Sequence, residues 1–313
     1  MRRIGGHSLS GAMGALLLAA SACTEATPVA RVEPRAKTGP LVVYTVNEPL
    51  RYFAARIGGP HVEALLPAPD DVDPAFWLPE PEDLVGYQGA DLILRSGGGY
   101  ARWIGFASLP RSTQVDTSAG YRDRLIALRG SVTHSHGPQA AQSHGDTAFT
   151  TWLDLELAAQ QARAVGEAFA DARPLLRSDF EIASAKLVSD LERLDERLLE
   201  IGAAYEDESL LFSHPVYQYL QQRYGLGGDS LHWEPDQDPG PDEWGRLAER
   251  QARSPARWML WEAEPLPETQ RRLGELGITP IVFSPGGNAV EGVDWLALMN
   301  ANADRLEAAI RRD

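Results

Sequence analysis

The amino-acid sequence predicts an α/β protein of two lobes, each with a mostly parallel sheet flanked by helices, joined by one long rigid helix. Short apolar runs rich in β-branched residues alternate with helical patterns before residue 175 and again after residue 205, which is typical of parallel sheets. Between them, residues 178–202 carry apolar side chains at the spacing of one helix face: Phe180, Leu187, Leu191, Leu194, Leu198 and Ile201. A helix of this length spans roughly 37 Å, although an ordinary long helix inside one domain would show the same pattern.

The first lobe is predicted to begin with a strand at residues 41–47 and to alternate strands with helices. Further strands are expected at 61–66, 90–95 and 113–117, and helices at 49–57, 82–88, 100–106 and 152–170. Residues 130–147 lack apolar periodicity. They are predicted to form a loop that holds three of the seven histidines, His134, His136 and His144.

The long helix has start and stop signals, and the alternation resumes after it. Ser178 and Glu181 have the spacing of a capping box, Pro174 lies upstream, and Gly202 ends the pattern. Strands are expected at 210–213, 229–233, 258–261 and 279–283, and helices at 216–224, 242–253, 267–276 and 294–311. Ligands of such folds usually lie outside the carboxyl ends of the strands, here between the lobes.

Composition limits the partners and the number of domains. The 313 residues are 43% apolar and 23% charged, which suits one large or two medium domains. A formal charge of -15 argues against nucleic acid as a partner. We therefore expect lobes at residues 40–175 and 205–313, with the linking helix at 176–204.

The N-terminus has the pattern of an export signal. Arg2 and Arg3 precede a short apolar run that ends at Cys23, the only cysteine, so an internal disulfide is excluded. The run is too short to span a bilayer. The segment LLLAASAC resembles a bacterial lipoprotein signal, which implies a signal peptide at 1–22, a lipid-bearing Cys23 and a flexible tether at 23–39. The alternative is an ordinary secretion signal with an incidental cysteine.

Four segments recur in the order and spacing of a known family. They are NEPLRYFAARIGGPHVEALLP, DPAFWLPEPEDLVGYQGADLIL, TTWLDLELAAQQA and FSHPVYQYLQQRYGL. This set resembles the periplasmic metal-binding proteins of zinc and manganese ABC importers, the ZnuA/TroA-like cluster A-I substrate-binding proteins. The resemblance implies a monomeric receptor and not an enzyme. It would hold Zn²⁺ or Mn²⁺ between two lobes and hand it to a membrane permease.

The resemblance also implies four metal-ligand positions, three of which lack a strong donor here. Ala75 replaces the histidine of an Asp-Pro-His motif, and Thr150 holds the place of a histidine two residues before a tryptophan. His214 matches the third ligand, and Ser284 stands near the place of the acidic fourth. Tight zinc sites need three or four donors at about 2 Å. The inherited site is therefore not expected to bind metal tightly by itself.

Other side chains are candidates to replace the lost donors. The loop histidines His134, His136 and His144 precede the second ligand position. His134 and His136 are two residues apart and could form a weak chelate for a metal. A solvated loop whose histidines have no role explains the sequence equally well. His232, Glu234 and Glu262 lie at predicted strand ends of the second lobe. The alternative to a metal receptor is a divergent member of the family that has lost its metal site. Such a protein would bind another ligand or act as an accessory partner-binding protein.

Aromatic residues are the last feature of the expected cleft. Phe76, Trp77, Trp152, Trp233 and Trp261 lie beside the ligand positions or at strand ends. They would plug the cleft, stack on an organic ligand, or simply pack in the core. Neither GxxxxGK[ST] nor GxSxG is present, so nucleotide binding and serine hydrolysis have no support.

Overall fold

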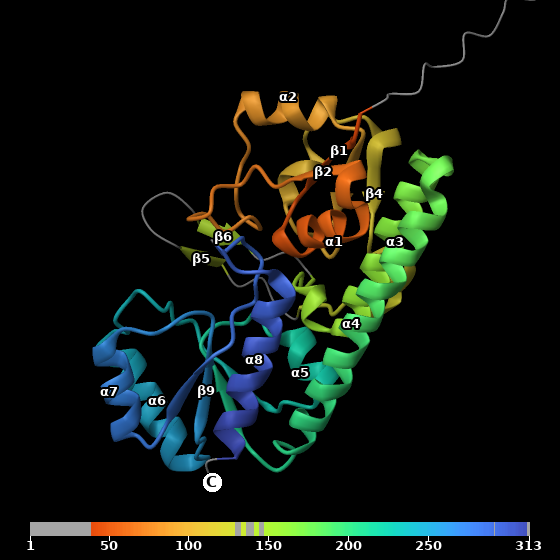
Figure 1. Ribbon diagram of the computed structural model, residues 1–313. Coiled ribbons are helices and arrows are strands. Elements are labelled where there is room, and N and C mark those ends of the chain that lie inside the picture. The colour runs from red at the N-terminus through yellow and green to blue at the C-terminus, as the bar shows by residue number, and fades with distance from the viewer. Residues whose placement is uncertain (1–38, 129–132, 136–140, 144–146, 291, 312–313) are drawn as a thin grey trace, which may run out of the picture. The chain divides into compact units, whose positions relative to one another are not determined.

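The computed structural model describes residues 39–128, 133–135, 141–143, 147–290 and 292–311. Residues 39–313 form one compact unit that contains two four-stranded parallel sheets (Figure 1). The strand orders are β2-β1-β3-β4 in the first sheet and β10-β9-β7-β8 in the second. The predicted α/β fold class is thereby confirmed.

The first sheet is built from β1 (Leu41–Thr45), β2 (Val62–Leu65), β3 (Leu92–Arg95) and β4 (Gln114–Asp116). Its helices are α1 (Glu48–Gly58) and α2 (Pro81–Gly89). Asn47 caps α1, because its side chain accepts a hydrogen bond from the amide of Leu50 at 3.2 Å. The carboxyl ends of β1 and β3 point toward the middle of the unit, where the chain leaves the sheet to form loops.

The second sheet is built from β7 (Leu210–Phe212), β8 (Gly228–Ser230), β9 (Trp258–Trp261) and β10 (Thr279–Val282). Its helices are α5 (Gln218–Tyr224), α6 (Pro241–Arg253), α7 (Pro267–Glu275) and α8 (Trp295–Ile310). Every pairing in both sheets is parallel, so the carboxyl ends of neighbouring strands lie side by side.

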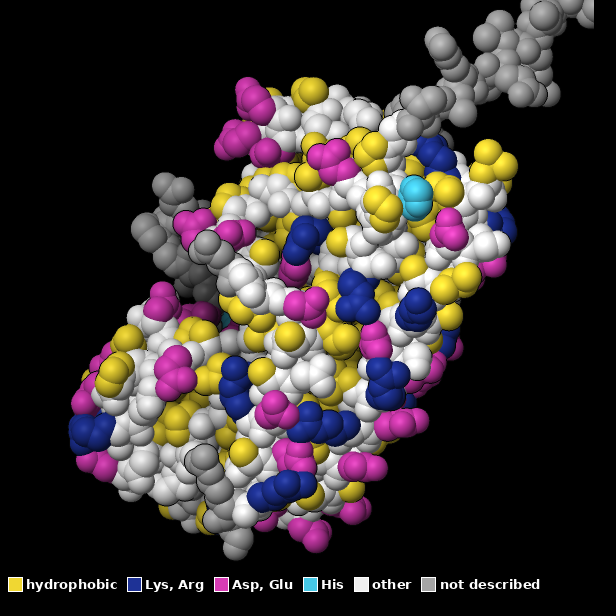
Figure 2. Space-filling view, in the orientation of Figure 1, with side chains coloured by type: hydrophobic (Ala, Val, Ile, Leu, Met, Phe, Trp, Pro, Cys, Tyr) yellow, Lys and Arg dark blue, Asp and Glu magenta, His cyan; other side chains and the backbone are white. Residues whose placement is uncertain are grey.

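The long helix α4 (Arg177–Ala203) packs against both lobes, as the sequence predicts. It contacts α1 and α3 (Leu155–Ala172) at one end and α5 and α8 at the other. All six side chains of the predicted apolar face are buried. On its outer side, Arg163 pairs with Glu192, and Arg197 pairs with Asp304 and Glu307. Figure 2 shows basic and acidic side chains interspersed along this flank.

The predicted capping box at Ser178 is wrong. A 3₁₀ turn at Pro174–Leu176 runs directly into α4, so that Ser178 lies inside the helix and Leu176 holds the cap position without a side-chain bond. Likewise α3 begins later than predicted, because Asp154 caps it by accepting from the amides of Glu156 and Leu157.

Two other segments differ from the sequence prediction. Only Arg102–Gly105 of the predicted helix at 100–106 is helical, as a single 3₁₀ turn, because Gly97 to Gly99 and Ala101 all have positive φ and interrupt a helical path. The predicted loop at 130–147 contains an antiparallel ribbon of β5 (Thr133–Ser135) and β6 (Ala141–Ser143).

The apolar core is continuous across the two sheets. One cluster of buried side chains includes residues of both, and Trp295 of α8 packs its ring 5.4 Å from that of Phe53 of α1. A second cluster, on the other face of the second sheet, contains Trp233, Trp244 and Trp261. Of the alternatives for Trp233 and Trp261, packing in the core is therefore the one that the structure shows. Of the helices in the described ranges, none combines the length and apolar character needed to cross a bilayer.

Candidate metal and ligand site

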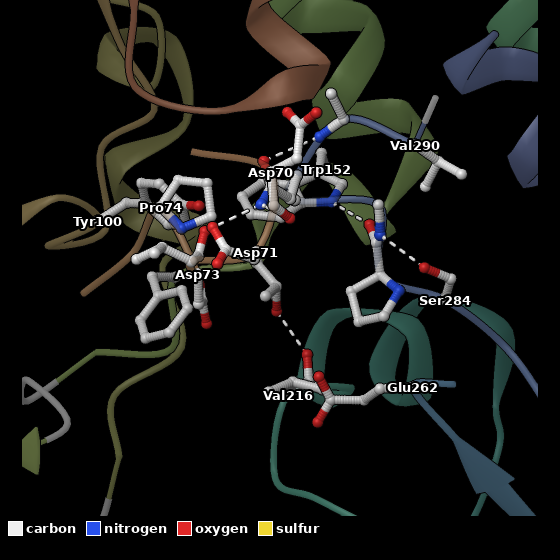
Figure 3. A pocket seen from close by; sticks show the side chains of 18 residues that line it. Asp70, Asp71, Asp73, Pro74, Tyr100, Trp152, Val216, Glu262, Ser284 and Val290 are labelled. Carbon is white, nitrogen blue, oxygen red and sulfur yellow. Dashed lines mark hydrogen bonds between the residues drawn. The ribbon is translucent and has the colours of Figure 1, made fainter. Parts of the chain in front are cut away.

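A cavity of about 350 Å³ lies where the carboxyl ends of the two sheets meet (Figure 3). One side is formed by the acidic loop, residues 69–73, which follows β2, together with Tyr100, Thr150 and Trp152. Glu262 and residues 284–290, which follow β9 and β10, form the other side. Both lobes therefore contribute to one site.

The strand-end cluster, His214, His232, Glu234 and Glu262, lies beside this cavity. In the second sheet Phe212 is aligned with Leu260 of β9 and with Ser230 of β8. Extending this register by two residues places His214 next to both Glu262 and His232. The contacts agree: His214 Nδ1 lies 3.0 Å from Glu262 Oε1, and the rings of His214 and His232 are 5.9 Å apart. Glu234 Oε1 is 3.9 Å from the same nitrogen.

The charge around His214 favours its protonated form. Burial by itself would lower the pKa of His214, but the hydrogen bond to Glu262 and the charges of Glu262, Glu234 and Asp73 outweigh burial and raise that pKa. Because a carboxylate only accepts, Nδ1 of His214 must donate to Glu262. This arrangement orients the ring and leaves Nε2 as the nitrogen that would bind a metal.

Of the four ligand positions that the family resemblance implies, two line the cavity and two adjoin lining residues. Thr150 and Ser284 line the cavity, as does Pro74 next to the buried Ala75. His214 is not a lining residue, but it reaches the cavity through Glu262. The Thr150 hydroxyl donates to the carbonyl of Val216 at 2.5 Å.

Outside this cluster, the structure describes one further histidine side chain, that of His61, and the aromatic candidates. His61 packs against Phe180, with ring centroids 6.2 Å apart, and is not part of the cavity lining. His134 lies on β5, while His136, His144 and Cys23 fall outside the described residues. Among the aromatic candidates Trp152 lines the cavity, Phe76 packs edge-on against the lining residue Phe149, and Trp77 packs against Trp103.

Sequence reasoning missed the acidic loop and the residue that holds it. The side-chain nitrogen of Asn288 lies within hydrogen-bond distance of the carbonyls of Pro69, Asp70 and Val72, at 3.1, 2.7 and 2.9 Å. Glu48 also donates its amide to Gly287 at 2.9 Å. The run PAPDDVDP, directly after β2, was the signal available in the sequence, because carboxylates at a strand's carboxyl end face the site.

Gly286 lets this segment pass close to α8. Its φ is +64°, which favours glycine, and a Cβ there would lie 3.0 Å from atoms of both Met299 and Trp295. The indole of Trp152 donates to the carbonyl of Pro285 at 2.7 Å. Residues 284–290 are thus fixed against both lobes.

A metal ion alone does not find a full set of ligands here. Within the described part of the chain, no group of three or more His, Cys, Asp or Glu side chains is arranged to hold an ion. Zinc usually takes four tetrahedral ligands at about 2.0–2.3 Å. The described side chains supply the imidazoles of His214 and His232 and nearby carboxylates, but no three of them are arranged around one ion, so the site is incomplete.

Comparison with known proteins identifies the family. The model of the family described as "zinc-uptake complex component A periplasmic" matches residues 43–309. The chain belongs to this family. The family is named as a component of an uptake complex and not as a catalyst, in line with the expectation that the chain is not an enzyme.

Individual relatives are distant. The high-affinity zinc uptake system protein ZnuA of Bacillus subtilis is 22% identical over 202 residues, 64% of this chain and 63% of that protein. The zinc-binding lipoprotein AdcA of Streptococcus pneumoniae is 22% identical over 282 residues, 86% of this chain and 56% of that protein. The chain thus spans less than two thirds of the length of either relative.

A solved structure has the same fold. The metal-dependent lipoprotein YcdH of Bacillus subtilis superposes with a TM-score of 0.74 at 20% identity, covering 86% of this chain and 98% of that one. At this identity the similarity concerns the fold alone, and the ligand of this chain has to be argued from its own residues.

Proposed function

We propose that this chain is the extracytoplasmic receptor of a metal ABC importer, which binds a divalent metal, zinc or manganese, and delivers it to a permease. Family membership and the zinc-uptake and zinc-binding relatives support this function. The observation that carries it for this chain is the contact of the buried His214 with Glu262, a half-buried lining residue of a cavity rich in carboxylates. An imidazole held by a carboxylate at its far nitrogen is the usual arrangement of a metal-binding histidine.

His214 is proposed as the main protein ligand, with Glu262 next to it. His232 and Glu234 are the nearest further donors. Ala75, Thr150 and Ser284 mark the positions of lost ligands. The sequence suggests one further source of metal donors within the chain, the loop histidines His134, His136 and His144.

The chain is further proposed to be a monomer, anchored to the outer side of the cytoplasmic membrane by lipid on Cys23. The proposed organisation is a signal peptide at 1–22, a tether at 23–39, lobes at 40–175 and 205–313, and a linking helix at 176–204. Cys23→Ser is expected to move the protein from the membrane fraction to the soluble fraction. Unchanged membrane association and mass in this variant would rule out the anchor.

Metal analysis of the purified chain tests the function directly. The whole chain is expressed, its bound metals are measured, and zinc and manganese are titrated in competition with a coloured chelator. One bound divalent ion per chain is expected, and His214→Ala is expected to abolish its retention. A chain that retains no metal under any condition would contradict the proposal.

That outcome would favour the second candidate, a divergent receptor that takes another ligand or an accessory partner. The specific observation in its favour is the incomplete ligand set among the described residues. Retention of an unrelated small molecule by the metal-free chain would support it.

A further inference from the structure

The cavity is much larger than an ion requires. A water molecule occupies about 30 Å³ in the liquid, and pockets for small organic molecules begin near 300 Å³. The cavity of about 350 Å³ falls at the small end of that range. It has room for an ion together with a small organic molecule.

The described donors at the cavity are not arranged to hold an ion by themselves. The Thr150 hydroxyl is engaged with Val216, Ser284 offers only a neutral hydroxyl, and Ala75 offers none. His214 supplies one imidazole at the edge. Zinc prefers nitrogen and sulfur donors beside carboxylates. His232 is the nearest further nitrogen donor, but no third described ligand is arranged with these two imidazoles, so an ion here needs donors from outside the described side chains.

Tyr100, a lining residue, has a buried hydroxyl without a described hydrogen-bond partner. Its side chain is 6% exposed and lines the cavity, and its hydroxyl has no hydrogen-bond partner among the described residues. Burial, with a smaller contribution from the charge of Asp73, raises the pKa of Tyr100, so the hydroxyl stays protonated and can donate. Buried polar groups normally have partners, which indicates a ligand that accepts from this hydroxyl.

The charge and the ring faces of the lining restrict that ligand further. Asp70, Asp71, Asp73 and Glu262 line the cavity, and none of its described lining residues is Lys or Arg. This surface repels an anionic complex and attracts a cationic one. Tyr100 packs edge-on against Phe149 and Trp152, each with ring centroids 5.4 Å away, so a flat ring has aromatic neighbours.

We propose that the cavity takes the divalent metal as a complex with a small nitrogen chelator that carries an imidazole or amine and a single carboxylate. This inference rests on the proposed metal-receptor function and specifies the form of its cargo. His214 replaces one water on the metal, the chelator supplies the missing nitrogen donors, and Tyr100 donates to the chelator's carboxylate. Zinc with one histidine anion carries a single positive charge, which suits the acidic lining.

Equilibrium dialysis with L-histidine distinguishes the two forms of cargo. The whole chain, in mild detergent, is dialysed against a fixed total concentration of zinc while L-histidine is increased. A receptor for the bare ion loses zinc, because histidine competes for it. A receptor for the complex gains zinc, and we expect at least a fivefold gain, with one radiolabelled histidine retained per zinc.

The dialysis distinguishes failure of the chelator proposal from failure of the metal-receptor function. Zinc that is retained without histidine and lost as histidine rises would overturn this inference and leave the metal-receptor function intact. Zinc that is retained under none of the conditions would overturn both. Citrate, an anionic chelator, is expected to give no gain, and a gain equal to that with histidine would contradict the charge argument.

Tyr100→Phe tests the recognition step with the loss of a single oxygen. We expect the histidine-dependent gain of zinc to disappear while the melting temperature does not fall, because the hydroxyl has no described partner to lose. Tyr44→Phe is the matched control, since Tyr44 is a half-buried tyrosine of the same lobe that does not line the cavity. A Tyr100→Phe variant that behaves like the unaltered chain would remove Tyr100 from the proposal.

Discussion

The two sides of the cavity differ in how they are built and in what they can bind. The strand-end cluster on the second lobe holds His214 by the parallel register of three neighbouring strands. The acidic loop on the first lobe has no such support from a sheet and is held by Asn288 across the cavity. One side thus has a rigid imidazole, and the other has carboxylates on a tethered loop.

For the proposed metal site, this difference means that only the second lobe supplies a strong donor. The described residues at the first-lobe positions, Ala75 and Thr150, offer no strong donor, whereas the second lobe keeps an oriented histidine. A site with strong donors from only one lobe binds an ion weakly unless further ligands complete the coordination of the metal. Each prediction below alters one side, or the link between the two sides.

The largest effect is expected from His214→Ala. Four-ligand zinc sites are worth roughly 10–16 kcal/mol in total, so removing one good ligand should cost several kcal/mol, about 100-fold or more in zinc affinity. A competitive titration with a coloured chelator measures it. His61→Ala is the control, because His61 packs against Phe180 outside the cavity lining. Equal behaviour of the two variants would place the metal elsewhere.

A smaller effect is expected from Glu262→Gln. This change keeps the size of the side chain but removes the charge that holds Nδ1 of His214, and altering such a partner typically lowers metal affinity about 10- to 100-fold. Glu264→Gln, an exposed carboxylate two residues along the chain, should change nothing. If Glu262→Gln binds zinc as well as the unaltered chain, Glu262 does not orient the ligand.

The link between the two sides is tested by Asn288→Ala. The variant loses the hydrogen bonds to the acidic loop and should be destabilised by about 1–2 kcal/mol. Urea unfolding followed by tryptophan fluorescence measures this. Asn300→Ala serves as the comparison, since Asn300 bonds only within α8 among the described contacts, to Leu296. Equal stability of both variants would show that the loop is held by other contacts.

The smallest effect is expected from deleting residues 130–146. If an external chelator supplies the missing donors, zinc retention in the presence of histidine should fall less than threefold. A loss as large as that caused by His214→Ala would show instead that His134, His136 or His144 donates to the metal.

The sequence predicted the strand-end cluster of the second lobe better than the acidic loop of the first lobe. His232, Glu234 and Glu262 were expected at strand ends, and the register of β7 with β8 and β9 indeed brings them to His214. Alternation along a strand explains why Trp233 packs in the core, because successive side chains point to opposite faces and Trp233 lies between His232 and Glu234.

Other features depend on contacts that no local pattern contains. Asn288 reaches carbonyls more than 200 positions earlier in the chain, and nothing near residue 288 signals that pairing. The start of α4 was misjudged for a related reason. Ser178 has the residue type of a cap, but the turn at Pro174–Leu176 leads the backbone into the helix one residue before it.

The position of bound zinc tests the central claim most directly. A crystal of the chain grown with zinc and L-histidine, measured on both sides of the zinc absorption edge, locates the ion by anomalous scattering. We predict one ion about 2 Å from a ring nitrogen of His214, the usual zinc–imidazole distance, with non-protein density between it and Tyr100. An ion bound elsewhere, with the cavity beside Glu262 holding neither metal nor chelator, would contradict the account.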